Sequence, residues 1–173
     1  MTDQFPGYPR KLRRTDIRDG FESGAKELDD WIGRFALQDQ RANSATTYVS
    51  CVDKLVIGYY SITVGAVAKH AAPTAISKGV PDQVACMVIP RLAVDRGWQG
   101  KNIGAALLKD ALERSAFVSN AVAARAVLVH APNDAARAFY ASQLDFLPSP
   151  VNDLQLMIPM KEVQRIFGKD KLV

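Results

Sequence analysis

Residues 91–108 read RLAVDRGWQGKNIGAALL, and this stretch decides the fold that we expect. It starts as the end of an apolar strand, passes through a turn with Gly97 and Gly100, and becomes a helix at Gly104. Glycines let backbone N–H groups approach an anion, and the start of a helix adds a partial positive charge. The stretch therefore predicts a site for a phosphate or pyrophosphate. The alternative is a strand-to-helix turn that needs glycine only for its own conformation.

Two well-known phosphate motifs do not fit this stretch. No Gly-Lys-Ser/Thr closes the turn, which excludes a Walker P-loop, and the glycine spacing differs from that of the dinucleotide fingerprint. Two histidines and two cysteines are scattered along the chain without metal-ligand spacing, so we expect no metal site.

Outward from the turn, strand-like and helix-like patterns alternate. We expect strands at residues 10–15, 47–52, 55–64, 84–94, 126–130 and 154–158, and helices at 24–42, 104–117 and 132–143. The order predicts an α/β domain with a mixed sheet, in which residues 84–130 form a parallel, right-handed strand–helix–strand unit. We expect one domain over residues 1–173, with its core at about 10–160 and a short C-terminal tail.

Several local features refine this assignment. In the first helix Leu28, Trp31, Ile32 and Phe35 follow the spacing of one buried face, with Ser23 as its cap. Pro90 predicts a bulge or a break in pairing within its strand, because proline cannot donate to a ladder. Residues 69–83 form a long irregular connection, and residues 53–54 close a hairpin. The last helix should carry Pro132 near its first turn.

Composition describes a globular protein with a mild positive charge. Of its 173 residues, 48% are hydrophobic and 23% charged, and the net charge is +4. No apolar run approaches the roughly 20 residues of a membrane helix, and the polar, basic N-terminus does not look like a secretion signal. Cys51 and Cys86 lie in strand-like runs, so buried free thiols and a cytoplasmic location are expected.

Basic residues crowd one short segment near the N-terminus. Such a cluster is either a solvated strand edge or a patch that faces phosphates. Its members are Arg10, Lys11, Arg13, Arg14 and Arg18.

The phosphate-binding stretch resembles a family signature. Residues 99–105, QGKNIGA, are similar to the Gln/Arg-x-x-Gly-x-Gly/Ala motif of the GNAT family of N-acetyltransferases, with Gln99 at the first position and Gly104 at the last. Asn102 stands where the family has its middle glycine. Asparagine is the next best residue for a left-handed backbone, so the turn can still form.

Other motifs resemble one branch of that family, the acetyltransferase toxins of bacterial toxin–antitoxin modules. They cover residues 10–160 and are Phe21-x-Ser-Gly-x-x-x-Leu28-x-x-Trp31, Gly58-Tyr-Tyr-x-Ile62, Arg91-Leu-Ala-Val-Asp95 and Ala138-Phe-Tyr140 before Phe146-x-Pro-Ser-Pro150. The resemblance implies a splayed parallel strand pair flanked by helices. It also implies transfer of acetyl from acetyl-coenzyme A (acetyl-CoA) to the α-amino group of aminoacyl-tRNA, which blocks translation. The implied partners are a ribbon-helix-helix antitoxin and a second copy of the chain.

The resemblance also implies roles for individual residues. Leu92, Ala93 and Val94 would pair through their backbone with the pantetheine arm of the cofactor. Tyr140 would protonate the departing thiolate; its alternative role is that of a core aromatic. The pyrophosphate would be held by the N–H groups of Gln99, Gly100, Lys101, Asn102, Ile103, Gly104 and Ala105. Asn133 and Phe139 would contact the cofactor, and the candidates for tRNA contact are Arg13, Arg14, Arg91 and Arg96.

The acceptor is the least determined part of this interpretation. Asp95 and Asp134 both look like loop or cap residues, so no general base is evident. This favours an amine that is already largely neutral, such as that of an aminoacyl ester, whose pKa lies below the ordinary α-amino value of about 7.7 to 8.0. The alternatives are an acetyltransferase for a small amine or a protein N-terminus, and an acyl-CoA-binding module without turnover. Asn102 would permit that last alternative, and Tyr140 argues against it.

Overall fold

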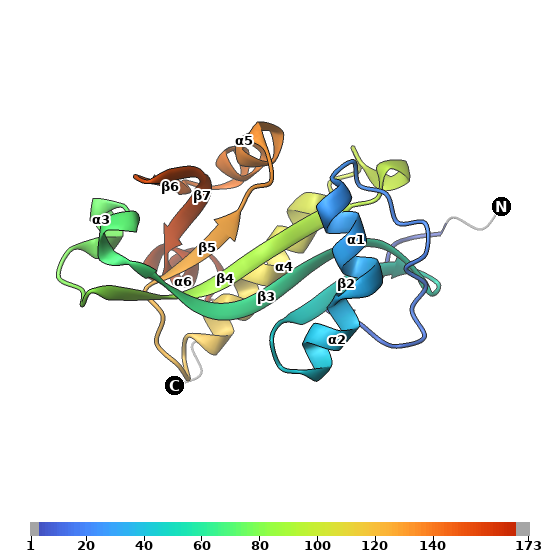
Figure 1. The fold of residues 1–173 in the computed structure, drawn as a ribbon, viewed down its shortest axis with the longest axis horizontal. Coiled ribbons are helices and arrows are strands. Elements are labelled where there is room, and N and C mark those ends of the chain that lie inside the picture. Colours follow the sequence, from blue (N-terminus) through green and yellow to red (C-terminus); the bar gives the residue numbers. More distant parts are fainter. Residues whose placement is uncertain (1–3, 169–173) are drawn as a thin grey trace. The chain divides into compact units, whose positions relative to one another are not determined.

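The structure is a computed structural model and describes residues 4–168, whose helices and strands are labelled in Figure 1. The strands are β1 (Arg10–Lys11), β2 (Thr46–Val52), β3 (Leu55–Ala68), β4 (Gln83–Val94), β5 (Ala126–His130), β6 (Leu147–Ser149) and β7 (Asn152–Pro159). The helices are α1 (Lys26–Arg34), α2 (Ala36–Arg41), α3 (Thr74–Ser77), α4 (Ile103–Val118), α5 (Asp134–Gln143) and α6 (Met160–Phe167). Two 3-10 turns cover Lys69–Ala71 and Arg96–Trp98.

Neighbouring strands are hydrogen-bonded in the order β1-β2-β3-β4-β5-β7-β6, which forms one seven-stranded sheet. Strands β4 and β5 are parallel, with Cys86 to Ile89 facing Ala126 to Val129, whereas β2 and β3, and likewise β5 and β7, are antiparallel. This confirms the predicted mixed sheet and its parallel strand–helix–strand unit. The β4–β5 ladder ends at Ile89, directly before Pro90, although β4 itself runs on to Val94.

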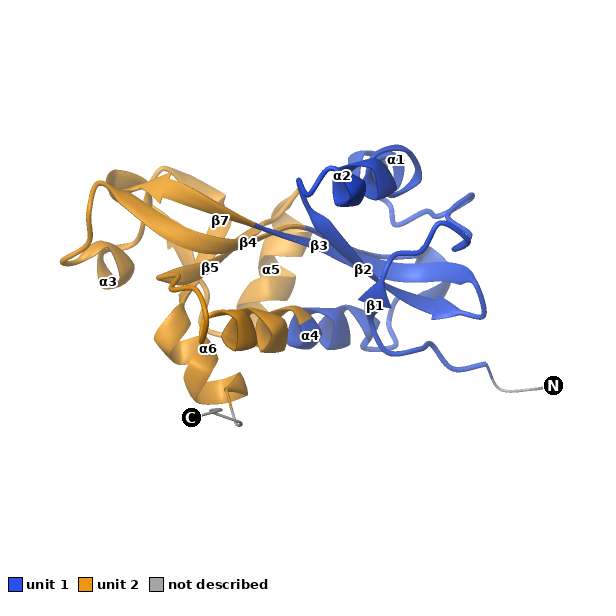
Figure 2. Cartoon of the chain, turned by 90° about the horizontal axis from the view of Figure 1, so that it is seen from below, with its two compact units in different colours: residues 1–63, 91–110 blue, residues 64–90, 111–173 orange. Residues whose placement is uncertain are grey.

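The chain forms two compact units (Figure 2). The first contains Met1–Thr63 and Arg91–Asp110, and the second contains Val64–Pro90 and Ala111–Val173. Each unit is built around apolar side chains of its own.

In the first unit, α1 packs the predicted face of Leu28, Trp31 and Ile32 into the core. The ring of Tyr59 stacks on Trp31 at a centroid distance of 5.9 Å, and its hydroxyl donates to the carbonyl oxygen of Leu28 at 2.7 Å. Burial of these large side chains contributes roughly 1.5–3 kcal/mol each. The amphipathic pattern therefore fixes how α1 packs within this unit.

The core of the second unit is formed by apolar side chains of β4, β5, β7 and α3. Cys86 and Val88 of β4, Leu128 of β5 and Met157 of β7 are buried together with Ile76 of α3. Both cysteines of the chain are free and buried, as predicted.

Three predictions about the N-terminal helix and strand are wrong. The helix expected at 24–42 breaks at Phe35, which has φ −115° and is 48% exposed, so Phe35 does not belong to the buried face. The cap position of α1 is Ala25, while the Ser23 hydroxyl donates to Asp29 Oδ1 at 2.6 Å. The first strand covers only Arg10–Lys11, because a turn that begins at Arg13 follows it.

The chain after β3 departs from the prediction in four places. Pro132 lies before α5 rather than in its first turn, because Asn133 is the cap. The irregular connection at 69–83 contains α3. Strand β6 and helix α6 were not expected, and they occupy Leu147–Ser149 and Met160–Phe167.

Candidate active site

The predicted phosphate-binding turn is anchored by one carboxylate. Asp95 Oδ1 accepts from the N–H of Gly97 at 3.0 Å, and its Oδ2 accepts from the N–H of Glu22 at 3.0 Å. The backbone N–H of Asp95 donates to Ile57 of β3 at 2.9 Å. Asp95 therefore caps the 3-10 turn after β4, which makes it a structural carboxylate rather than a general base.

Gln99 fixes the other side of the turn. Its Nε2 donates to the carbonyl oxygens of Ser23 at 2.8 Å and Val94 at 2.9 Å. Such a double contact ties the turn both to the end of β4 and to the segment before α1. The first position of the signature thus shapes the turn with its side chain, while its backbone N–H closes the 3-10 turn by donating to Arg96 O at 3.4 Å.

Gly100 and Asn102 give the turn its direction. Their φ angles are 78° and 62°, so both are left-handed. This confirms that asparagine can take the position of the family's middle glycine. The first helical bond found here runs from Ala106 to Asn102 at 3.1 Å. Among residues 4–168 no acceptor is found for the N–H groups of Ile103, Gly104 and Ala105, as is usual in a first helical turn.

The start of α4 is held close to β3. A Cβ added at Gly58 would lie 3.0 Å from Leu107 Cδ1 and 3.4 Å from Ile103 Cγ2. Leu107 is itself 1% exposed. Gly58 therefore allows the first turns of α4 to approach β3, and this close packing sets where the free N–H groups lie. Leu92, Ala93 and Val94, the predicted pantetheine residues, belong to the same unit, and Ala93 is part of its core.

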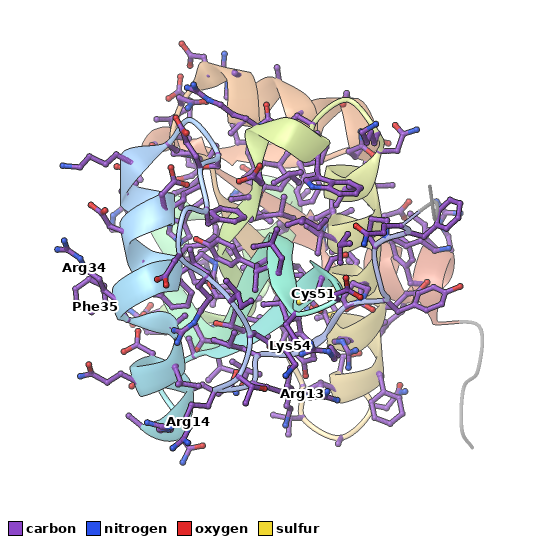
Figure 3. The ribbon with its side chains drawn as sticks, turned by 90° about the vertical axis from the view of Figure 1, so that its right-hand side faces the viewer. Arg13, Arg14, Arg34, Phe35, Cys51 and Lys54 are labelled. Atoms are coloured by element: carbon purple, nitrogen blue, oxygen red, sulfur yellow. The ribbon has the colours of Figure 1, made fainter. Side chains whose placement is uncertain are left out.

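The four candidate arginines have different surroundings. The guanidinium carbon of Arg91 lies 4.1 Å from the centroid of the Trp31 ring, and burial lowers the pKa of Arg91. Arg96 is exposed and pairs with Glu22 at 3.4 Å. Arg13 and Arg14 are exposed and project from the turn after β1, as Figure 3 shows.

The predicted proton donor lies in the second unit. Tyr140 is 2% exposed and packs against Phe139 at 5.4 Å and Phe146 at 5.7 Å between ring centroids. Burial raises the pKa of Tyr140 above its ordinary value, so its hydroxyl keeps its proton near neutral pH. Asn133 Oδ1 accepts from Ala136 N at 2.9 Å, so this oxygen caps α5.

The hydroxyl of Tyr140 differs from those of two other buried tyrosines. Tyr59 donates to Leu28, and Tyr60 donates to Asp110 Oδ2 at 2.5 Å. Within residues 4–168 no hydrogen bond is found for the Tyr140 hydroxyl. A buried tyrosine usually bonds its hydroxyl. Within the described residues, the Tyr140 hydroxyl is therefore not engaged in a structural hydrogen bond.

No cluster of three His, Cys, Asp or Glu side chains able to hold a metal ion is found among residues 4–168. None of the helices there is long and apolar enough to cross a membrane. Asp134 is exposed and lies 4.0 Å from Arg137, an ion-pair distance at the start of α5.

The sequence alone did not indicate that two further residues, Asp16 and Lys54, contribute to the surroundings of the basic segment. Asp16 is buried beneath the turn that carries Arg13 and Arg14, and Lys54 of the β2–β3 hairpin lies beside that turn. The signal for Asp16 was a single acidic residue inside a basic run. Nothing in the local sequence links Lys54 to that run.

Comparison with known proteins places these features in a family. The model of the acetyltransferase (GNAT) family matches residues 11–146. A tRNA-acetylating toxin of Mycobacterium tuberculosis is 38% identical over 164 residues, which cover 94% of this chain and 98% of the toxin.

Solved structures show the same fold. AtaT complexed with acetyl-methionyl-tRNAfMet has a TM-score of 0.83 and 26% identity, with 92% of this chain and 98% of that chain covered. AtaTR bound with acetyl-CoA has a TM-score of 0.80 and 26% identity, with 92% and 96% covered. With its pinned left-handed turn, its parallel β4–β5 pair and these matches, the chain belongs to the acetyltransferase (GNAT) family.

Proposed function

We propose that this protein is an acetyltransferase that moves the acetyl group of acetyl-CoA to the α-amino group of an aminoacyl-tRNA and so blocks translation. One observation carries the cofactor half of the proposal. A left-handed turn, pinned by Asp95 and Gln99, leads into a helix whose first N–H groups have no acceptor in the part of the chain that the structure describes. Oriented N–H groups at a helix start suit a pyrophosphate.

The acceptor half rests on the relatives. A tRNA-acetylating toxin shares 38% of its residues with this chain, and AtaT was solved with acetyl-methionyl-tRNA. Neither Asp95 nor Asp134 is positioned as an unengaged base, which suits an amine that is already neutral. An aminoacyl ester provides such an amine, whereas a lysine side chain, with an ordinary pKa of about 10.4, does not.

Each role in our proposal is the one that the family resemblance implies. The N–H groups from Gln99 to Ala105 hold the pyrophosphate, the backbone of Leu92 to Val94 pairs with the pantetheine arm, and Asn133 and Phe139 contact the cofactor. Acetyl-CoA supplies an activated acyl group whose carbon–sulfur bond breaks as the new amide forms. Tyr140 donates its proton to the departing sulfur, and the amine loses its extra proton to solvent.

Tyr140 suits this role because its hydroxyl is protonated and has no hydrogen bond among residues 4–168. Burial raises its pKa, so the hydroxyl still carries its proton when the thiolate departs. General acid catalysis typically contributes 10²- to 10⁴-fold, so the absence of this proton donor should be measurable.

The biological setting is proposed by analogy with the same relatives. AtaT has been solved bound to the C-terminus of the antitoxin AtaR. We propose that this chain works as one acetyltransferase domain in the cytoplasm, forms a homodimer, and is neutralised by an antitoxin with a ribbon-helix-helix part.

The test is acetylation of charged tRNA by Tyr140→Phe. The variant keeps the ring and loses no hydrogen bond found among the described residues, so stability and acetyl-CoA affinity should stay close to wild type. Turnover should fall by 10²- to 10⁴-fold. As a control, Tyr59→Phe loses its bond to Leu28, so stability should fall by about 0.5–1.5 kcal/mol without loss of chemistry.

The acceptor is tested with the wild-type enzyme and labelled acetyl-CoA. We expect label on charged tRNA and none on uncharged tRNA. Label on free amines or peptide N-termini but not on charged tRNA would support the alternative acceptors. Near-normal turnover by Tyr140→Phe would show that water or the substrate supplies the proton.

A further inference from the structure

Asp16 is a buried carboxylate that closes a turn of basic residues. Its side chain is 1% exposed and receives two hydrogen bonds from the Arg10 guanidinium, at 2.8 and 2.9 Å. Asp16 Oδ2 also accepts from the backbone N–H of Arg13 at 2.7 Å, and Asp16 N donates back to Arg13 O at 3.0 Å. The carboxylate thus holds residues 13–16 in one conformation.

The β2–β3 hairpin fixes where this turn lies. Leu12 N donates to Thr47 O at 2.9 Å on one side of the turn. On the other side Ile17 N donates to Lys54 O at 2.6 Å, and Val56 N donates to Ile17 O at 3.0 Å. Lys54 is therefore held next to a turn that lies some forty residues earlier in the sequence.

Three cations project from this arrangement, which we call the basic turn: Arg13, Arg14 and Lys54. All three are exposed, and no ion pair is found for them among residues 4–168. Figure 3 shows Arg13 and Arg14 near the bottom of the view and Lys54 above Arg13, whereas Arg34 projects from α1 on the left.

The charge of the protein is concentrated around the basic turn. Residues 10–19 and 53–54 contain six cations and three carboxylates, which is +3 of the chain's net +4. One of those carboxylates, Asp16, is buried and faces inward. An anion bound at the basic turn would offset the mutual repulsion of these exposed like charges. Arginine and lysine donors in a fixed arrangement suit phosphate oxygens.

We propose that the basic turn is a preformed site for the sugar–phosphate backbone of tRNA, and that Asp16 is the positioning residue that makes it. This inference rests on the proposed function, because tRNA is the substrate there. Asp16 does not contact the RNA. It presents the three cations by fixing the backbone between Arg13 and Ile17.

The decisive variant is Asp16→Asn, because a net-charge effect and loss of the fixed turn would change the affinity for tRNA in opposite directions. The substitution removes a negative charge, so net charge alone would tighten tRNA binding. Loss of the fixed turn should instead weaken it, by about three- to tenfold if roughly one phosphate contact is lost. Binding of tRNA is measured over a series of salt concentrations, and a thermal melt verifies that the variant is folded.

A matched pair of triple variants tests the cations themselves. Arg13, Arg14 and Lys54 are changed to Gln in one variant, and Lys26, Arg34 and Arg41 of α1 and α2 in the other, so the change in net charge is the same. The first triple should reduce the slope of log K against log salt by about 2 to 3, at roughly 0.7–0.9 per phosphate contact. The second should leave the slope nearly unchanged.

Several results would overturn the proposal. A folded Asp16→Asn protein that binds tRNA as tightly as wild type would remove the positioning role. If the two triple variants change the salt slope equally, tRNA binding responds to net charge and not to the basic turn. If the first triple variant loses antitoxin binding but keeps tRNA binding, the basic turn is a surface for an acidic protein. If Asp16→Asn does not fold, the triples decide. Wild-type turnover on charged tRNA is measured in parallel, because its absence rejects the proposed function, whereas turnover with an unchanged slope rejects only the basic turn.

Discussion

Asn102 offers a direct test of the cofactor site, since its backbone is left-handed with φ 62° immediately before α4. A Cβ-bearing residue without a polar side chain pays about 1–2 kcal/mol in this conformation. Asparagine already bears part of that strain, so we expect Asn102→Ala to lower the free energy of unfolding by about 1 kcal/mol. Asn102→Gly removes the strain but adds about 0.4–1 kcal/mol of unfolded-chain entropy, which leaves it close to wild type.

The same strain should appear in cofactor binding. The N–H groups that follow Asn102 point toward the pyrophosphate site only while the backbone at residue 102 is left-handed. If alanine moves this backbone out of the left-handed region, these N–H groups should lose their alignment. A loss of about 1 kcal/mol corresponds to roughly fivefold weaker acetyl-CoA binding, measured by titration calorimetry. The melting temperature should fall by about 2–4 °C.

Asn43 provides the matched control because it is also left-handed, with φ 58°, and lies in the loop after α2. Asn43→Ala should destabilise the fold by a similar amount and leave acetyl-CoA affinity unchanged. If Asn102→Ala binds acetyl-CoA as tightly as wild type, or if both alanine variants lose affinity equally, the turn does not hold the pyrophosphate.

Three further outcomes are expected. Gly58→Ala places a Cβ 3.0 Å from Leu107 Cδ1, so urea unfolding should show a loss of about 1–3 kcal/mol, with weaker acetyl-CoA binding; unchanged values would show that Leu107 yields freely. Burial alone would raise the pKa of Asp16, but hydrogen bonds from Arg10 and the turn outweigh it and lower that pKa. The stabilisation is therefore present above the unfolded pKa of about 4 and lost as pH falls through the folded value, so melts below pH 4 should converge for wild type and Asp16→Asn. Burial raises the pKa of Cys86 to about 11, and a thiol reagent at pH 8 should modify neither buried cysteine before denaturation.

Local patterns determined the parts of this protein that depend on neighbouring residues. The turn from Gln99 to Ala105 could be predicted because left-handed backbone, helix start and strand end all lie within a few residues of one another. The face of α1 formed by Leu28, Trp31 and Ile32 followed from helical spacing in the same way. The parallel β4–β5 pair followed from the strand–helix–strand order, since the handedness of such units is nearly fixed.

Only tertiary structure decided the features that depend on distant segments. The sequence pattern predicted a continuous helix through Phe35, but the helix is interrupted at this residue and its ring is exposed. Asp16 looked like one acidic residue among cations until burial beside Arg10 made it the centre of a turn. Lys54 joins Arg13 only through backbone bonds between the N-terminal segment and the hairpin. Helical spacing and turn propensity act over a few residues, whereas burial and strand pairing depend on which remote segments come together, and no local pattern encodes that choice.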